Sequence, residues 1–119
     1  MVEKLGFRPG ETVFVEDTPD WYSAFAEENG FELEPGLPAT HAHLFLNSKK
    51  ELAKFLKDND LEEIEKSLWV SWPKKSSGVK TDLTEQDFRN LILPTGWVDV
   101  KVVAIDDTWT GFKFLRRKR

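Results

Sequence analysis

The fold is decided by residues 41–73, which read HAHLFLNSKKELAKFLKDNDLEEIEKSLWVSWP. The apolar run at 44–46 predicts a strand buried on both faces, which is typical of parallel sheets. Ser48 followed by Glu51 is a capping-box pattern, so we expect a helix to begin there. A second strand is predicted at 68–72. A strand, a capped helix and a strand in this order predict a right-handed crossover between parallel strands.

The alternation of strands and helices continues toward the N-terminus. Residues 12–16 are β-branched and aromatic and predict a strand. Thr18 and Pro19 predict the N-cap and the first residue of a helix, because proline at the first helical position loses no hydrogen bond. We expect this helix to close at residues 29–30, and residues 31–34 to form a short strand.

Toward the C-terminus, Thr84 and Asp87 form another capping-box pattern, and residues 98–105 and 111–115 predict two strands joined in a hairpin. These elements predict an α/β fold, a three-layer Rossmann-like sandwich with a mainly parallel sheet and a C-terminal antiparallel hairpin. The length of 119 residues is typical of one domain. We therefore expect a single domain over residues 1–119, with a basic C-terminal tail at 116–119.

Composition excludes several classes of protein. The chain has no cysteine, which excludes disulfides, thiolate metal sites and thiol nucleophiles. The net charge is −4, and because four of the seventeen basic residues are residues 116–119, the rest of the chain carries −8. A nucleic-acid binder needs a basic face, so we expect at most weak contact through the tail. The sequence has neither an apolar run of roughly 20 residues nor a signal-peptide pattern, so we expect a cytoplasmic protein without membrane contact.

The segment 44–115 resembles the C-terminal half of S-adenosylmethionine-dependent methyltransferases, whose last two strands form such a hairpin. Residues 68–78, with 97–99 and 106–109, are also similar to a small family of uncharacterised bacterial proteins that carry a domain of unknown function. The resemblance implies a truncated, methyltransferase-like version of the Rossmann-like sandwich. It also implies a cofactor site at the carboxyl ends of the first strands.

The sequence departs from that family where the cofactor would bind. The methyltransferase fold places a glycine-rich turn after the first strand and an acidic residue at the end of the second. Residues 15–21 read VEDTPDW and contain no glycine, so two carboxylates, a proline and an indole take the place of the turn. We therefore expect no cofactor, and in particular no S-adenosylmethionine bound as in those enzymes.

The polar loop after residues 68–72 is the strongest candidate site. It lies where open α/β sheets bind ligands, and lysines, hydroxyls and a glycine with accessible backbone N–H groups are the components of an anion site. The candidate residues are Lys74, Lys75, Ser76, Ser77 and Gly78, with Asp107 and Trp109 from the hairpin. Two plainer interpretations remain open. The loop and hairpin can be simple solvated turns, or the lysines can be neutralised by Glu16, Asp17, Asp106 or Asp107.

Other chemistry is disfavoured. His41 and His43 share one face of a strand, but no further ligand stands at a recognisable spacing, so we expect no metal site. No nucleophile elbow surrounds the serines at 76–77, and no catalytic set can be assembled. The sequence favours a non-catalytic binding or regulatory module that recognises a small anion or an acidic protein partner. A degenerate or atypical S-adenosylmethionine-dependent methyltransferase remains the alternative.

Overall fold

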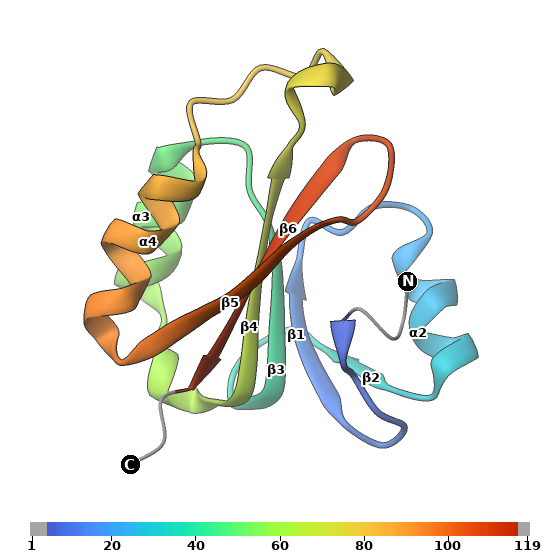
Figure 1. Ribbon diagram of the computed structural model, residues 1–119. Helices are drawn as coiled ribbons and strands as arrows, with labels where there is room; N and C mark the ends of the chain where they lie inside the picture. The colour runs from blue at the N-terminus through green and yellow to red at the C-terminus, as the bar shows by residue number, and fades with distance from the viewer. Residues whose placement is uncertain (1–4, 117–119) are drawn as a thin grey trace.

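The computed structural model describes residues 5–116, which form a six-stranded sheet between two helical layers (Figure 1). The strand order is β2-β1-β3-β4-β6-β5. Helix α2 covers one face of the sheet, and α3 and α4 cover the other (Figure 1). The strands are β1 (Thr12–Glu16), β2 (Glu32–Glu34), β3 (Ala39–Phe45), β4 (Ile64–Pro73), β5 (Trp97–Ala104) and β6 (Trp109–Arg116). The helices are α2 (Tyr22–Asn29), α3 (Lys49–Asp58) and α4 (Glu85–Ile92), and short 3-10 turns are η1 (Leu61–Glu63), η2 (Lys75–Ser77) and η3 (Leu93–Thr95).

The sheet confirms the predicted fold class. Strands β2, β1, β3 and β4 are mutually parallel, and β6 runs antiparallel to both β4 and β5. The predicted pairing of the strand at 44–46 with the strand that holds Trp69 is parallel, with Leu44 opposite Val70. The closing hairpin is β5–β6. The expectation of one domain over residues 1–119 stays a prediction.

Alternate residues of the inner strands β1, β3, β4 and β6 bury into two separate apolar clusters. The cluster beneath α3 and α4 includes Leu44, Trp72 and Phe88, and the cluster beneath α2 includes Tyr22 and Trp69. Trp69 and Trp72 therefore lie on opposite faces, as their spacing of three in a strand predicts. Both faces are buried at the end of β3 and in the second half of β4, which explains the short apolar segments at 44–46 and 68–70.

Two of the three predicted helix starts are confirmed. The Ser48 hydroxyl accepts a hydrogen bond from Glu51 N at 3.2 Å, which caps α3. A complete capping box begins α4, where the Thr84 hydroxyl and the Asp87 carboxylate each accept a backbone N–H of the other residue. These caps satisfy backbone donors that a helix leaves unpaired.

The predicted start of α2 at Thr18 is wrong. The helix begins at Tyr22, and no side chain caps it. Pro19 instead forms a tight turn, in which its carbonyl accepts a hydrogen bond from Tyr22 N at 3.0 Å. The Trp21 indole donates to the Asp106 carboxylate at 2.9 Å, so a contact with the distant hairpin fixes the first residue before the helix.

The basic tail expected at 116–119 begins inside the sheet. Arg116 is the last residue of β6 and not part of a free tail, because its guanidinium bonds the Glu62 carboxylate and the carbonyls of Leu61, Glu62 and Ile64. The remaining tail residues, 117–119, lie outside the described residues. Within residues 5–116, no helix is long and apolar enough to cross a membrane.

Candidate functional site

The sheet reverses its direction of growth between β1 and β3. From β1 the chain passes outward to β2 and then returns to β3 on the other side of β1. Open α/β sheets bind ligands at the carboxyl ends of the strands that flank such a switch point. A crevice of about 410 Å³ opens there between the strand ends and α3. Its lining residues are Glu16, Asp17, Leu44, Phe45, Leu46, Glu51, Lys54, Phe55, Asp58 and Asn59.

The crevice is strongly acidic above an apolar floor. Four carboxylates and one ammonium group line it, and the floor is made of side chains from the end of β3 and from α3. The Glu51 carboxylate also accepts a hydrogen bond from Asn47 N at 3.1 Å, which ties α3 to the end of β3. Glu16 and Asp17 have no ion-pair partner within residues 5–116. The crevice therefore attracts a cation and repels phosphate.

Asp17 gives the turn after β1 an unusual backbone. Its φ is +52°, and it is the non-glycine residue with positive φ in the described part of the chain. Glycine adopts this left-handed region most readily, and aspartate tolerates it better than most residues do. An aspartate therefore adopts, directly after β1, a backbone conformation that glycine adopts most readily. At the end of β2 stands Glu34, which does not line the crevice.

The predicted anion loop follows β4 and is held by its own hydrogen bonds. The Ser77 hydroxyl donates to the Lys74 carbonyl at 2.6 Å and accepts from Val79 N at 3.2 Å. The backbone N–H groups of Ser77 and Gly78 bond the carbonyls of Lys74 and Lys75. These N–H groups are therefore used inside the loop, and Ser76 is exposed. The loop therefore offers a ligand its lysine side chains and the exposed Ser76 hydroxyl.

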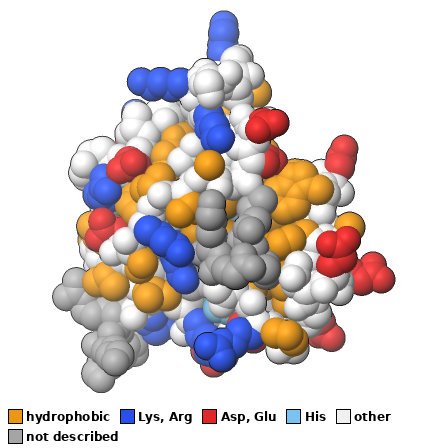
Figure 2. All heavy atoms as spheres, turned by 45° about the vertical axis from the view of Figure 1, so that its right-hand side comes forward, with side chains coloured by type: hydrophobic (Ala, Val, Ile, Leu, Met, Phe, Trp, Pro, Cys, Tyr) orange, Lys and Arg blue, Asp and Glu red, His pale blue; other side chains and the backbone are white. Residues whose placement is uncertain are grey.

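The lysines of this loop are not neutralised within the described residues. Lys74 and Lys75 form no ion pair in residues 5–116, so the alternative in which Glu16, Asp17, Asp106 or Asp107 pairs with them is not what the structure shows. Basic side chains project at the top of the molecule in Figure 2, where Figure 1 places the η2 loop. This half of the carboxyl edge therefore carries lysines that are unpaired within the described chain beside two carboxylates, whereas the β1–β3 half is mainly acidic.

Of the residues in the β5–β6 hairpin turn, Asp106 shapes the turn and Trp109 packs on the core. Asp106 shapes the turn, because its carboxylate accepts hydrogen bonds from Thr108 N and Trp109 N, each at 2.8 Å. The Trp109 ring packs edge-on against Phe45 with centroids 5.1 Å apart, so it covers the rim of the core. Asp107 is exposed. The structure thus places Trp109 in the core rim and leaves Asp107 at the surface beside the loop.

His43 lies in a buried chain of hydrogen bonds under α2. Its Nδ1 lies 2.7 Å from the Tyr22 hydroxyl, and its Nε2 lies 2.8 Å from the Ser71 hydroxyl. All three side chains are fully buried. Burial lowers the pKa of His43 to about 3 and raises the pKa of Tyr22 well above its ordinary value. His43 is therefore a neutral, fully satisfied core residue.

His41 forms a second chain at the amino end of the sheet. Its Nδ1 lies 2.6 Å from the Ser67 hydroxyl and its Nε2 lies 2.8 Å from the Glu11 carboxylate. Burial raises the pKa of Glu11, but hydrogen bonds from Lys66 and His41 outweigh it and bring the pKa to about 2. Ser67 is 1% exposed and therefore cannot meet a substrate, although the order of groups resembles a nucleophile and its base. Residues 5–116 contain no group of three or more His, Asp or Glu side chains that could hold a metal ion.

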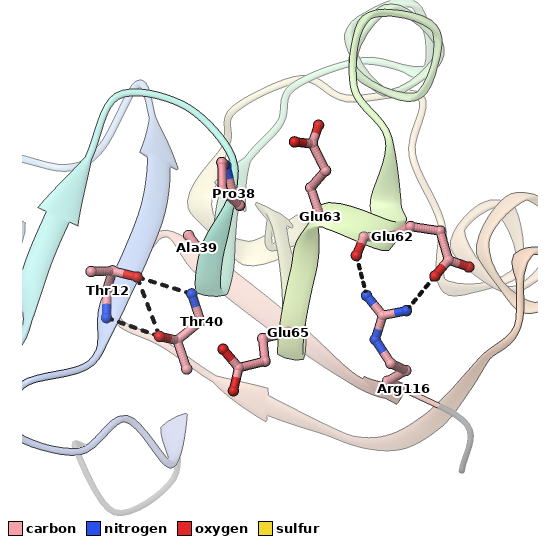
Figure 3. A pocket seen from close by; sticks show the side chains of 8 residues that line it. All are labelled: Thr12, Pro38, Ala39, Thr40, Glu62, Glu63, Glu65 and Arg116. Carbon is pink, nitrogen blue, oxygen red and sulfur yellow. Dashed lines mark hydrogen bonds and ion pairs between the residues drawn. The ribbon is translucent and has the colours of Figure 1, made fainter. Parts of the chain in front are cut away.

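A larger hollow, of about 600 Å³, lies at the opposite, amino end of the strands (Figure 3). Its polar groups are largely bonded to one another. Thr12 and Thr40 exchange hydrogen bonds between their hydroxyls and backbone N–H groups, and the Arg116 guanidinium bonds Glu62 at 2.7 Å (Figure 3). Glu63 and Glu65 complete the lining. The hollow lies at the edge that open α/β sheets do not use for ligands.

Sequence reasoning missed the acidic crevice. It noted Glu16 and Asp17 only as partners for the lysines, and it did not connect them with Glu51 and Asp58 of α3. One signal was available, because side chains three, four and seven residues apart share a helix face. Glu51, Lys54 and Asp58 have this spacing in the helix that follows the switch-point strand. That face points back toward the end of β1.

Residues 44–119 match the model of the family described as Domain of unknown function (DUF8412). The chain belongs to this family. The match covers the part of the DUF8412 chain from the end of β3 onward, which includes α3, the η2 loop, α4 and the β5–β6 hairpin. A search of the curated proteins found no significant match.

Solved structures similar to the DUF8412 chain share its sheet. A protein of the NADB-Rossmann superfamily from Streptococcus agalactiae has a TM-score of 0.59 at 7% identity, over 97% of this chain and 66% of that one. LepI in complex with SAH and a substrate analogue has a TM-score of 0.53 at 15% identity, over 97% and 38%. Magnesium protoporphyrin IX methyltransferase (ChlM) from Synechocystis PCC 6803, with bound SAM, has a TM-score of 0.51 at 10% identity, over 97% and 74%. The chain thus spans two thirds or less of the first two proteins, and these identities show a common fold of the Rossmann and methyltransferase type.

Proposed function

We propose that the chain is an atypical methyltransferase-like domain that binds a sulfonium ligand of the S-adenosylmethionine type in the acidic crevice between β1, β3 and α3. The observation that carries the proposal is the charge of that crevice, where Glu16, Asp17, Glu51 and Asp58 surround one lysine at the switch point of the sheet. Two of the similar structures support it through the shared fold, because LepI holds SAH and the methyltransferase ChlM holds SAM. The proposal replaces the expectation of no cofactor.

The chemistry of the residues suits this ligand and disfavours nucleotides. S-adenosylmethionine carries a sulfonium and an ammonium group against one carboxylate, so its net charge is positive. Opposite charges about 4 Å apart attract by roughly 1–4 kcal/mol near a protein surface. Dinucleotides and nucleoside triphosphates carry phosphates, which the same carboxylates repel. The apolar side chains of Leu44, Leu46 and Phe55 supply the surface that the ligand's adenine and carbon chain need.

The turn after β1 makes this binding atypical. Asp17 keeps the left-handed backbone of that turn, but its side chain stands where a glycine would let a ligand approach the backbone closely. The ligand would therefore be held by carboxylates at a distance set by the Asp17 and Glu16 side chains. When bound, a sulfonium ligand supplies a methyl group to a nucleophile, and the described residues of this chain bind and orient that ligand.

Calorimetry of the whole chain with S-adenosylmethionine tests the proposal. We expect saturable binding that is at least about tenfold weaker in Glu16→Gln/Asp17→Asn, because two charge-assisted contacts are lost. The product S-adenosylhomocysteine lacks the sulfonium charge and should bind more weakly than S-adenosylmethionine, and ATP should not compete.

The matched control is Glu27→Gln/Glu28→Gln, which removes the same charge from an exposed part of α2 away from the crevice. It should bind like the unchanged chain. Absence of saturable binding, or equal weakening in both double variants, would reject the proposal.

A second candidate function is the non-catalytic binding module. The observation that favours it is the pair of lysines, Lys74 and Lys75, without an ion-pair partner within residues 5–116. A screen for binding that depends on these lysines, in a chain that fails to bind S-adenosylmethionine, would favour this candidate.

A further inference from the structure

A second hollow at the carboxyl edge lies between the end of β4 and the start of α4. It measures about 490 Å³ and opens on the same face of the sheet as the acidic crevice, over the neighbouring strands. The residues that matter for its chemistry are Lys74, Lys75 and Thr110, with Trp72, Pro73 and Leu83 as its apolar wall. We call this hollow the lysine groove.

The ammonium groups of the lysine groove are free, whereas its carboxylates are engaged. Lys74 and Lys75 have no ion-pair partner within residues 5–116. The Asp82 carboxylate accepts a hydrogen bond from Lys49 N at 2.8 Å, and the Glu85 carboxylate pairs with Arg89 at 2.9 Å. Two lysines without an ion pair stand against one carboxylate, Asp82, that no basic side chain of the described residues neutralises, so the lining keeps a net positive charge.

Among the threonine hydroxyls that line the groove, only that of Thr110 is free of hydrogen bonds within the described residues. The Thr84 hydroxyl is occupied as the cap of α4, and the Thr81 hydroxyl donates to the Asn47 carbonyl at 2.7 Å. Thr110 makes no side-chain hydrogen bond within the described chain, and it lies opposite Trp72 in the β4–β6 pairing. Its hydroxyl is available to a ligand beside the lysines.

The wall of the groove is apolar and fixed. Trp72 is 9% exposed, and its ring packs against Phe88 with centroids 4.9 Å apart. Leu83 is buried in the same cluster, and its backbone N–H bonds the Thr81 hydroxyl at 3.1 Å. A wall held in this way presents a preformed surface to an aromatic or aliphatic group.

We propose that the lysine groove binds a small organic anion. Its carboxylate or phosphate head contacts the Lys74 and Lys75 ammonium groups and the Thr110 hydroxyl, and its apolar body lies against Trp72 and Leu83. The volume is that of a small-molecule site, which favours a small molecule over an acidic protein segment. The lysines supply point charges, because the N–H groups of Ser77 and Gly78 are already used within the loop.

This ligand is separate from the sulfonium ligand proposed above. The acidic crevice and the lysine groove share no lining residue. Between the two hollows, residues 81–82 are bonded to residues 47–49, through the Thr81 hydroxyl to the Asn47 carbonyl and through Lys49 N to the Asp82 carboxylate. Each of the two proposals can therefore fail while the other holds.

The test is an amide NMR titration of the whole chain with phenyl phosphate, benzoate, inorganic phosphate and benzyl alcohol at constant ionic strength. We expect phenyl phosphate and benzoate to give saturable shifts at residues 74–78 and 81–86, and the stronger of the two identifies the head group. Inorganic phosphate lacks the apolar body and benzyl alcohol lacks the charge, so each should bind at least about tenfold more weakly.

The variant Lys74→Gln/Lys75→Gln should lower the affinity for the aromatic anions at least about tenfold and leave thermal unfolding unchanged. Its matched control is Lys50→Gln/Lys57→Gln, which removes the same charge from the exposed face of α3 and should bind normally. Equal weakening in both variants, or shifts spread beyond residues 72–86 and the neighbours of Thr110 on β6, would show general electrostatic attraction and overturn the proposal. Saturable binding of a hexaglutamate peptide alone would overturn it in favour of a protein partner.

Discussion

The two faces of the sheet are buried by different chemistry. The face beneath α3 and α4 is closed by aliphatic and aromatic side chains such as Leu44, Val70 and Phe88. The face beneath α2 also buries polar groups, and His43 and Ser71 there are completely shielded from solvent. Every buried side-chain polar atom within the described residues has a hydrogen-bond partner. The polar face is therefore satisfied internally, and both hollows of the carboxyl edge open on the apolar face.

This difference separates structural polar groups from those available to ligands. The histidines attract attention in the sequence, but their nitrogens are used by Tyr22, Ser71, Ser67 and Glu11. By contrast, Asp17 in the acidic crevice and Lys75 in the lysine groove are exposed and form no ion pair in the described chain. A group that is already satisfied has little to offer a ligand, so we place ligand binding at the hollows of the apolar face and not at the buried histidines.

The largest effect is expected on the apolar face. Phe88→Ala removes a fully buried ring that packs against Trp72, and the cavity left behind should lower the free energy of unfolding by about 3–5 kcal/mol. Urea unfolding measures this, with an unchanged m-value as the sign that only stability has changed. A loss below about 1 kcal/mol would mean that this face can collapse around the cavity.

The polar face should make stability depend on pH. His43 has its pKa lowered to about 3 by burial, so in the folded chain it stays neutral while the unfolded chain takes up a proton near pH 6.5. The unfolded state therefore binds more protons between these values, and stability is full above pH 6.5 and falls as the pH drops. The loss should approach about 1.4 kcal/mol per pH unit, or roughly 3 kcal/mol by pH 4.

Glu11 acts in the same direction at lower pH. Its pKa of about 2 in the folded chain lies below the ordinary 4.5, so its contribution is present above pH 4.5 and is lost as the pH falls further. Unfolding in urea at a series of pH values measures the sum. The control His43→Leu should flatten the slope between pH 6.5 and 4.5, and an unchanged slope would mean that His43 is protonated in the folded chain.

A single hydroxyl deletion on the polar face should have a smaller effect. Tyr22→Phe leaves the ring in place but removes the partner of His43 Nδ1, and a buried polar atom without a partner costs about 1–3 kcal/mol. Thermal and urea unfolding measure the loss. The triple variant Tyr22→Phe/His43→Leu/Ser71→Ala should recover part of it, because all three polar groups of the buried chain are then absent. If Tyr22→Phe is neutral, the hydrogen bond contributes nothing net.

The same contrast explains what the sequence could predict. The apolar face follows simple periodicity and capping rules, so the positions of β3, β4, α3 and α4 and their parallel order could be derived. The start of α2 could not, because it depends on the contact between Trp21 and Asp106, which are 85 residues apart in the chain. The early part of β4 was also missed, since exposed Glu65 and Lys66 interrupt the apolar pattern. The loop after β4 is a polar loop, as the sequence predicts. The acidic crevice could not be predicted, because it forms only when folding brings the end of β1 close to α3.

The smallest effect is expected where the apolar face opens into the acidic crevice, at Asp17. Because its φ is +52°, glycine should fit this position without steric cost, and Asp17→Gly should change the free energy of unfolding by between zero and about +1 kcal/mol. Asp17→Asn tolerates the same backbone and should be neutral within about 0.5 kcal/mol, whereas Asp17→Ala should lose about 1 kcal/mol. Urea unfolding of the three variants measures the cost of the left-handed backbone, and equal stability of all three would show that the turn does not require it.

Binding of S-adenosylmethionine to the same variants separates the effect of the Asp17 backbone conformation from the effect of its charge. Asn and Gly both remove the carboxylate, so equal weakening assigns recognition to charge, while tighter binding by Asp17→Gly would show that close approach to the backbone is what the natural turn prevents.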